Sequence, residues 1–418
     1  MTQAQALAAL DQGYNIFLTG PAGSGKTYVL NAFIRELHRR RAIVSVTAST
    51  GIAATHLNGQ TIHAWSGIGI HDSLSSKELD RIVRSKKIRS RVQSAEVLII
   101  DEISMLHGRQ FAMVDTVCRA IRKNGTPFGG IQVVVCGDFF QLPPVFGSAD
   151  AVEYVYASPA WQTADFRVCY LTEQHRQIGG KLLQVLQDIR SGTATDETAA
   201  VLQSRVGRAP SSDDIVPKLF THNLDVDARN ELALAELAGE TEVFEMRSHG
   251  PAVHVERLKK GCLAPERLQL KLNARVMFVK NNGDAGYVNG TLGEIVGFNT
   301  DGWPIVETRD GRLIDVDPQT WNVEENEKVV ASISQVPLRL AWAMTVHKSQ
   351  GMTMDAARID LSKAFTYGMG YVALSRVRSL DGLFLDGINR MALSVDPGVL
   401  AHDRSFVAAS AAFERLVE

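Results

Sequence analysis

The chain reads IFLTGPAGSGKT from Ile16 to Thr27, and this stretch decides how its first part folds. A short apolar run precedes a loop of the pattern G-x-x-x-x-G-K-[ST], and a helical pattern of apolar residues follows it. Glycines in such a loop let backbone N–H groups wrap a polyphosphate, and the positive end of the helix dipole adds to the attraction. The stretch therefore predicts a strand, an ATP-binding loop and a helix. The predicted loop residues are Gly20, Pro21, Ala22, Gly23, Ser24, Gly25, Lys26 and Thr27.

Short apolar runs alternate with helical patterns on both sides of this loop. They lie at residues 16–18, 43–46, 97–100 and 131–136. Continuous apolar runs of this length, separated by amphipathic helices, are typical of the buried strands of a parallel sheet. The sequence thus predicts an α/β domain.

Two carboxylates directly follow one of these runs. Asp101 and Glu102 come after residues 97–100, where one carboxylate can hold Mg²⁺ and the next can polarise the attacking water. In the loop, Lys26 is expected to reach the β- and γ-phosphates, and the Thr27 hydroxyl is expected to ligate Mg²⁺. Together these residues predict an ATP hydrolase that uses Mg²⁺.

Three further residues are candidates for contact with the γ-phosphate. Gln141 follows the run at 131–136 and could sense this phosphate and orient water, although a polar turn residue before two prolines is the alternative. ATP hydrolysis also needs positive charge on the transferring phosphoryl group, and Arg176 and Arg376 are candidates to supply it. Spacing alone favours a surface arginine at both positions.

Charge is segregated along the chain. Lys and Arg total 44 against 46 Asp and Glu, so the formal net charge is −2. The overall charge therefore does not indicate a polyanionic partner such as nucleic acid. Residues 81–91 nevertheless carry six basic and no acidic side chains, which favours an insertion projecting from the α/β core, with a solvated helix face as the alternative. Residues 294–327 carry nine acidic side chains. Any nucleic-acid site must therefore come from local charge.

Length, cysteines and hydropathy restrict the class of protein. The 418 residues, of which 45% are hydrophobic, suffice for several domains. The four cysteines are 18, 33 and 93 residues apart, which fits neither a disulfide framework nor a zinc cluster. No run approaches the length of a membrane-spanning helix, and the first residues lack a signal-peptide pattern. We expect a cytoplasmic protein with reduced cysteines and no membrane partner.

The order of the motifs closely resembles the Pif family (petite integration frequency) of RecD-like superfamily-one DNA helicases. The resemblance covers about residues 1–390, and residues 128–145 are similar to that family's own signature. The motifs are, in order, GPAGSGKT, TASTGIAATHLNGQTIHAW, LIIDEISML, PFGGIQVVVCGDFFQLPPV, LTEQHRQ, LAWAMTVHKSQGMTMD and GYVALSRVRSLDGL.

This resemblance implies an α/β fold with two RecA-like parallel-sheet lobes that bind ATP between them. The first lobe would span residues 1–165, with a small wedge-like insertion at 66–93. The second lobe would consist of residues 166–254 and 336–418, interrupted by an SH3-like β-barrel at 255–335, where short apolar runs separated by turn residues also favour a small barrel.

The resemblance also implies roles for single residues. Gln5 would read the adenine edge, Arg176 and Arg376 would contact the γ-phosphate from the second lobe, and the loop with Gln350 and Gly351 would couple nucleotide to DNA. Single-stranded DNA would be contacted by Thr50, Gly51, Thr61, His63 and Trp65 in the first lobe and by Thr345, His347 and Lys348 in the second. Trp65 keeps core packing as its alternative, and His347 keeps the role of a hydrogen-bonded core histidine.

The activity implied by the resemblance is that of an ATP-dependent 5′-to-3′ DNA helicase. It would translocate on single-stranded DNA and unwind duplex or structured DNA in genome maintenance, as a monomeric motor that is associated with the nucleoid in a bacterial cell. Its partners would be single-stranded DNA, 5′-tailed duplexes and forks, with G-quadruplexes as a further candidate. Two alternatives share these motifs: a RecD-type helicase subunit associated with an exonuclease, and an ATP-gated remodeller that binds single-stranded DNA without unwinding.

Overall fold

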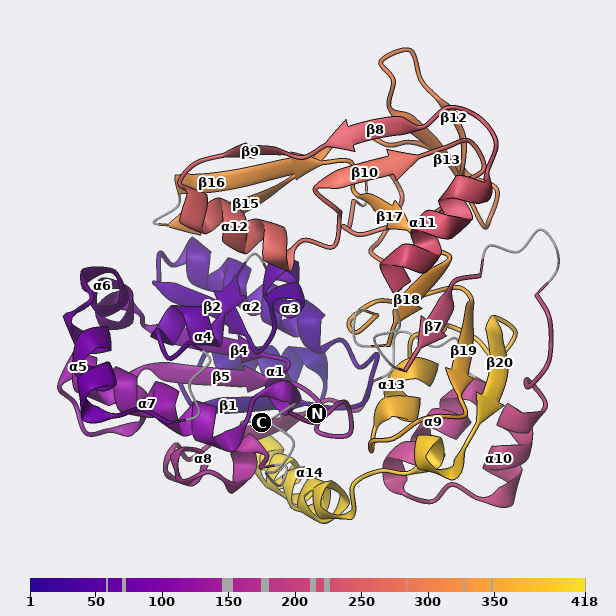
Figure 1. Ribbon diagram of the computed structural model, residues 1–418. Helices are drawn as coiled ribbons and strands as arrows, with labels where there is room; N and C mark the ends of the chain where they lie inside the picture. The colour runs from indigo at the N-terminus through magenta and orange to yellow at the C-terminus, as the bar shows by residue number, and fades with distance from the viewer. Residues whose placement is uncertain are drawn as a thin grey trace. The chain divides into compact units, whose positions relative to one another are not determined.

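The computed structural model divides the chain into two compact units, each built on a parallel sheet of its own (Figure 1). The first unit comprises Met1–His175 and Asp396–Glu418, and the second comprises Arg176–Val395. The described residues are 1–57, 59–69, 73–144, 153–173, 180–210, 216–221, 226–282, 284–325, 328–346 and 349–417.

A six-stranded parallel sheet forms the centre of the first unit, with the strand order β3-β2-β4-β5-β1-β6. Its central strands are buried because they are apolar on both faces, as parallel strands covered by helices must be. The predicted α/β fold and its four predicted strands are confirmed. The strands are β1 (Ile16–Thr19), β2 (Val44–Ala48), β3 (Gln60–Thr61), β4 (Val97–Asp101), β5 (Gln132–Cys136) and β6 (Arg167–Tyr170).

Amphipathic helices accompany this sheet. The predicted apolar stripe of α2 is buried in the core cluster of the unit. The large apolar residues of α7 are buried as well. The α-helices of the unit are α1 (Gln3–Leu10), α2 (Lys26–Arg39), α3 (Gly51–His56), α4 (Ile62–Ser66), α5 (Ser76–Arg84), α6 (Lys86–Ser94), α7 (Gly108–Arg122), α8 (Pro159–Thr163) and α14 (Pro397–Val417). Short 3₁₀ helices lie at η1 (Ile103–Met105), η2 (Pro127–Gly130) and η3 (Val155–Ala157).

The basic insertion folds as the helix pair α5 and α6. Its buried anchors are Ile82 and Val92. Arg91 fastens the pair to the neighbouring helix α4, because its guanidinium donates to the Ala64 carbonyl and to Gln60 Oε1, 3.5 Å away. The insertion therefore contacts α4 through Arg91.

The C-terminal helix α14 belongs to the first unit, whereas the family resemblance implies that residues 336–418 form part of the second lobe. The Tyr170 N–H donates to Ser410 Oγ at 3.0 Å, and the Tyr170 hydroxyl donates to Asp403 at 3.1 Å. Phe413 meets Tyr14 edge-on, with ring centroids 5.7 Å apart. The second unit therefore ends at residue 395, and the first extends past 165 to include β6.

The parallel sheet of the second unit has the order β18-β7-β19-β20. Its strands are β7 (Lys218–Phe220), β18 (Ala343–Thr345), β19 (Ala357–Leu361) and β20 (Leu383–Ile388). The helices around it are α9 (Lys181–Ser191), α10 (Asp196–Gln203), α11 (Val226–Glu236) and α13 (Met369–Leu374), with the 3₁₀ helix η4 (Arg390–Leu393).

Antiparallel sheets form the inserted β-rich part of the second unit, above the parallel sheet in Figure 1. They have the orders β14-β13-β12-β11-β17, β15-β16-β9 and β10-β8. The part begins before residue 255 and ends after 335, because β8 and β9 pair with β10 and β16, and β17 pairs with β11. Its elements are β8 (Glu242–Glu245), β9 (Arg247–His249), α12 (Ala252–Gly261), β10 (Arg267–Leu270), β11 (Arg275–Phe278), β12 (Leu292–Phe298), β13 (Pro304–Thr308), β14 (Leu313–Asp315), β15 (Gln319–Glu325), β16 (Lys328–Gln335) and β17 (Leu338–Leu340).

Candidate nucleotide and nucleic-acid sites

The glycine-rich loop joins β1 to α2 in a conformation that only glycine adopts easily. Gly20, Gly23 and Gly25 have φ angles of 142°, 88° and 87°. A Cβ atom on Gly20 would lie 2.6 Å from the Leu171 carbonyl oxygen and 2.9 Å from Ser24 Oγ. The loop therefore wraps tightly around the N-terminus of α2, which is the arrangement that a phosphate-binding loop requires.

Lys26 is held within this loop. Its ammonium donates to the carbonyl oxygens of Gly20 at 2.7 Å and Pro21 at 3.0 Å. These acceptors are neutral, and a phosphate oxygen offers the ammonium a stronger, charge-assisted hydrogen bond. Lys26 is thus positioned to exchange carbonyl partners for phosphate.

The carboxylates predicted to hold metal and activate water lie at the end of β4. Asp101 Oδ1 accepts the Glu102 N–H at 2.9 Å, and Glu102 has the left-handed angles φ 51° and ψ 45°. A non-glycine residue in this region stores about 1–3 kcal/mol of strain, which is typical of functional sites. Ser49, which the sequence reasoning missed, fixes this turn by donating N–H to the Asp101 carbonyl at 3.1 Å and Oγ–H to the Glu102 carbonyl at 2.7 Å.

The electrostatic environment of Asp101 fits a metal ligand. Burial raises the pKa of its carboxyl, while the Glu102 N–H, the Cys136 thiol and the Lys26 ammonium act in the opposite direction. A carboxylate and a hydroxyl are the oxygen donors that Mg²⁺ prefers. Asp101 and Thr27, in the first turn of α2, therefore suit a Mg²⁺ ion bound with the nucleotide phosphates.

Gln141 lies in a tight turn that follows β5, the strand next to β4. The Asp138 side chain accepts the Phe140 N–H at 3.2 Å, and the Asp138 carbonyl accepts the Gln141 N–H at 2.9 Å. Both Asp138 and Gln141 are buried. Because β4 and β5 are parallel neighbours, this turn and the Asp101 carboxylate lie at the same edge of the sheet.

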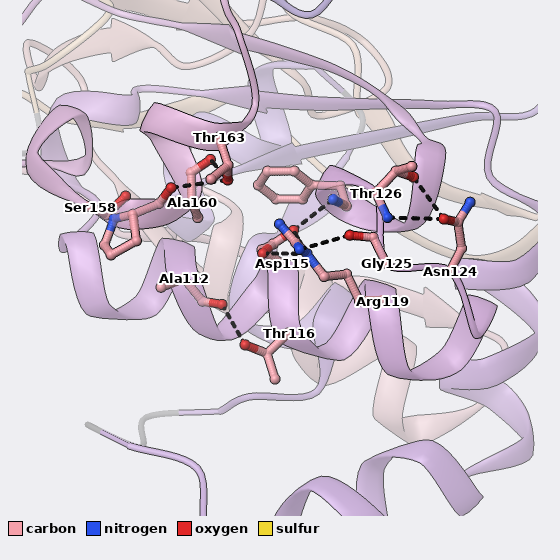
Figure 2. Close-up of polar contacts among 12 residues, drawn as sticks. Ala112, Asp115, Thr116, Arg119, Asn124, Gly125, Thr126, Ser158, Ala160 and Thr163 are labelled. Carbon is pink, nitrogen blue, oxygen red and sulfur yellow. Dashed lines mark hydrogen bonds and ion pairs between the residues drawn. The ribbon is translucent and has the colours of Figure 1, made fainter.

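The turn that leads into β5 is tied to α7 by side chains (Figure 2). Asp115 Oδ1 accepts the Phe128 N–H at 2.6 Å and the Arg119 Nε–H at 2.9 Å, and Arg119 donates to the Gly125 carbonyl at 2.8 Å. Phe128 and Gly129 are left-handed, with φ angles of 50° and 63°. A shallow surface depression lies beside this network, between α7 and α8. The segment that carries Gln141 is therefore fixed at its start.

Helix α1 lies against the glycine-rich loop. Gln5 forms a capping box with Thr2, whose N–H donates to Gln5 Oε1 at 2.8 Å. Gln3, which the sequence reasoning missed, donates its side-chain amide to the Ser24 carbonyl at 3.2 Å. The sequence signal that could have identified Gln3 was its position in the same helical turn as Gln5. This contact holds the helix that carries Gln5 next to the nucleotide loop.

Two threonines predicted to contact DNA lie at one edge of the first sheet. Thr61 ends β3 and caps α4, with its Oγ1 accepting the Ala64 N–H at 3.2 Å. Thr50 precedes Gly51 at the start of α3, and its Oγ1 accepts the Ala53 N–H at 3.3 Å. Because β2 and β3 are parallel neighbours, the structure brings these residues together.

His63 and Trp65 are less accessible than the resemblance implies. Trp65 is only 1% exposed, so its ring belongs to the core and is not available to stack on a base in this conformation. His63 is partly buried, and burial lowers its pKa, opposed by a hydrogen bond with Gln110.

Arg376 is buried in the second unit, at 1% exposure, so its interpretation as a surface arginine is wrong. Its guanidinium holds the loop that contains Gln350 and Gly351 by donating to backbone carbonyls on both sides of them. The acceptors are the carbonyls of Ser349 (3.5 Å), Met352 (3.3 Å) and Val372 (2.9 Å) and the Ser375 hydroxyl (2.8 Å).

The other functional residues predicted in the second lobe lie at the end of β18, in the segment after it, or before α9 in the sequence. Thr345 ends β18 and is buried, as is Gln350, while Gly351 has a φ of 78°. Arg176, His347 and Lys348 lie outside the described residues. Their predicted roles stay predictions.

Comparisons with known proteins identify the family to which the chain is similar. The model of the family described as PIF1-like helicase matches residues 2–200, and that of the 2B domain of DNA helicase Pif1 matches residues 254–298. The ATP-dependent DNA helicase Pif1 of Psychrobacter sp. is 44% identical, over 97% of this chain and 71% of its own length.

Two solved structures are also similar to the chain. Unliganded Pif1 from Bacteroides sp. is 31% identical, with a TM-score of 0.84, over 98% of this chain and 97% of its own. Pif1 helicase from Bacteroides in complex with ADP-AlF3 and ssDNA is 30% identical, with a TM-score of 0.66 and the same coverage.

Among the described helices, none is both long and apolar enough to cross a membrane.

Proposed function

The chain belongs to the PIF1-like helicase family and is an ATP-dependent DNA helicase, and we propose that it moves along single-stranded DNA in the 5′-to-3′ direction. The observation that supports the ATPase step best is the set of side chains in the first unit. The strained turn at Glu102 and the Asp101 carboxylate lie at the end of β4, and the loop that holds Lys26 follows β1; these two parallel strands flank β5 in the sheet. Family membership argues against an exonuclease-associated RecD-type subunit.

The hydrolysis of ATP follows from the roles of these side chains. The loop N–H groups and Lys26 hold the phosphates, and Gln141 orients the attacking water. Glu102 accepts a proton from that water as it attacks. We propose that Thr27 and Asp101 would hold a Mg²⁺ ion, which would supply positive charge to the transferring phosphoryl group.

Coupling of ATP to DNA rests on Arg376 in this proposal. An arginine that reaches the γ-phosphate must leave part of its present network, and that network includes the carbonyls of residues 349 and 352. The same loop continues from Thr345, the predicted DNA contact at the end of β18. A change of partner at Arg376 would therefore shift the loop and alter the grip on DNA, which produces stepping when repeated with each ATP.

The basic insertion supports a contact with DNA phosphates outside the single-strand track. Arg81, Arg84, Lys86 and Arg89 are exposed and form no ion pair within the described part of the chain. Such unpaired charges bind phosphate without reading sequence.

We propose 5′-tailed duplexes, forks and G-quadruplexes as substrates of a monomeric motor that works in genome maintenance, at the nucleoid of a bacterial cell.

The direct test is ATP hydrolysis with and without single-stranded DNA. We expect DNA to stimulate the wild-type protein strongly, and we expect Lys26→Ala and Glu102→Gln to lose the activity. Glu102→Gln should still bind ATP, because the amide keeps the shape of the carboxylate and removes only its basicity. A wild-type protein whose hydrolysis is indifferent to DNA would contradict the proposal.

A further inference from the structure

Two aromatic side chains are exposed on the loop between β19 and α13. Phe365 is 58% exposed and Tyr367 is 38% exposed. An exposed apolar side chain is unremarkable when it stands alone, whereas two exposed aromatic rings close together in the chain are a candidate for a binding surface. None of the functions described above uses either ring.

The backbone that carries these rings is well anchored. The Asn389 side-chain amide donates to the carbonyls of Ser362 at 3.1 Å and Ala364 at 2.8 Å. Asp360 accepts the Ser362 N–H at 3.0 Å, and Ala364 is buried directly before Phe365. The loop therefore presents its rings from a fixed base, so that little ordering entropy would be lost on binding.

The loop lies at the same sheet edge as the predicted DNA contact Thr345. All strands of the sheet β18-β7-β19-β20 are parallel, so their carboxyl ends share one edge. The register aligns Thr345 with Phe220, at the end of β7, and brings the end of β19 beside them. Two strand spacings separate β18 from β19, which is about 10 Å.

The same edge carries unpaired positive charge. The Arg229 guanidinium lies over the Phe220 ring, 5.0 Å from its centroid, and is exposed. Lys363 is exposed two residues before Phe365. Within the described residues, neither Arg229 nor Lys363 forms an ion pair with an acidic side chain. Exposed aromatic rings and exposed cations at one edge of a sheet match a strand of nucleic acid, in which bases and phosphates alternate.

We propose that Phe365 and Tyr367 form a base-stacking site for single-stranded DNA, with Arg229 and Lys363 contacting the phosphates on either side. The proposal rests on the helicase function and adds a base contact to the second unit. Stacking suits a translocating protein because every base has an aromatic face, so affinity does not depend on sequence.

Binding of fluorescein-labelled oligo-dT, measured by anisotropy, tests this site. We expect Phe365→Ala/Tyr367→Ala to weaken binding by about five-fold or more, since a stacked base contributes appreciably to affinity. Phe365→Trp should keep the affinity because it keeps a stacking surface. Leu313→Ala removes a similarly exposed apolar side chain from β14 and serves as the matched control. The anchoring Ala364 is untouched, and an unchanged melting temperature would confirm that the double variant is folded.

An oligonucleotide with abasic residues separates stacking from phosphate contact. The double variant and the wild type should bind it equally, because no base is present to stack. The proposal is overturned if the double variant binds oligo-dT as tightly as the wild type, or if the variant is weakened equally on the abasic strand. Stimulation of wild-type ATPase by DNA in the same experiment shows whether the helicase function itself holds, so the two failures can be told apart.

Discussion

Phe406 of the C-terminal helix stacks on Phe139, with ring centroids 6.0 Å apart and planes inclined by 28°. Phe139 lies two residues before Gln141, in the turn that follows β5. Next to it, His402 of the same helix stacks on Tyr156 at 4.4 Å, and Tyr156 meets Phe139 at 4.9 Å. The last helix of the chain thus packs against the turn that carries the predicted γ-phosphate sensor.

Removal of the Phe406 ring should slow hydrolysis without weakening ATP binding. Phe406→Ala is expected to lower kcat by about tenfold, because a small displacement of a catalytic group has an effect of this size, and to leave the KM for ATP nearly unchanged. Phe406→Leu should recover most of the activity. Phe413→Ala removes a more deeply buried ring of α14 that contacts Tyr14 instead, and should cost stability while preserving kcat. Equal losses of kcat in the Phe406 and Phe413 variants would refute the positioning role.

Gly20→Ala should abolish ATP binding and destabilise the fold. The added Cβ would meet the Leu171 carbonyl and Ser24 Oγ below normal contact distances, in addition to the cost of the positive φ. Gly13→Ala is the matched control, because Gly13 also has a positive φ, 81°, but nothing lies within 4 Å of its added Cβ. We expect Gly13→Ala to cost about 1–2 kcal/mol and to bind ATP normally. Thermal unfolding and binding of a fluorescent ATP analogue would measure both; normal ATP binding by Gly20→Ala would contradict the loop geometry.

Arg376→Lys should release the loop that contains Gln350. A lysine ammonium cannot reproduce the fork with which the guanidinium reaches several carbonyls, so buried acceptors lose their partners at a cost of about 2 kcal/mol or more. Hydrogen exchange at the Met352 and Met354 amides should accelerate, and ATPase activity should fall. Arg378→Lys replaces an exposed arginine that pairs with Asp355 at 3.1 Å and should change neither property. Unchanged exchange in the Arg376 variant would show that the loop is held by other contacts.

Burial of His63 predicts a stability that depends on pH. Its folded-state pKa lies below the ordinary value of 6.5, so the unfolded chain binds more protons below that pH. The contribution of His63 to stability should therefore be constant above pH 6.5. It should fall as the pH decreases through 6.5, until His63 is protonated in the folded protein as well. His63→Gln should flatten this part of the profile of melting temperature against pH between 8 and 5. An identical profile in wild type and variant would exclude His63 as the source.

Local patterns could locate the candidate nucleotide site in the sequence because its parts are contiguous in the chain. The loop from Gly20 to Thr27 and the pair Asp101 and Glu102 each follow one strand directly, so that the strand alone places them at the edge of the sheet. The neighbouring turn with Gln141 was found in the same way. Ser49 and Gln3 were missed because serine and glutamine are common on surfaces, and their partners lie far away in sequence.

Long-range packing decided what the sequence could not predict. Residues 397–417 form an amphipathic helix that could cover either lobe. Contacts with residues distant in sequence, among them Phe139, Tyr14 and Tyr170, place it on the first unit. The burial of Trp65 and Arg376 likewise depends on neighbours from other elements. A motif pattern identifies the residue type but not the direction in which the side chain points.

Strand displacement on tailed duplexes tests the helicase assignment and its polarity together. Two substrates of equal duplex length would carry a single-stranded tail at either the 5′ or the 3′ end of the longer strand, and displacement of a labelled strand would be followed after ATP is added. We predict ATP-dependent unwinding of the 5′-tailed duplex and none of the 3′-tailed duplex, with Lys26→Ala inactive on both. Unwinding of the 3′-tailed substrate, or DNA-stimulated ATP hydrolysis without displacement of either strand, would contradict a 5′-to-3′ helicase; the second result would identify a remodeller that grips DNA without unwinding it.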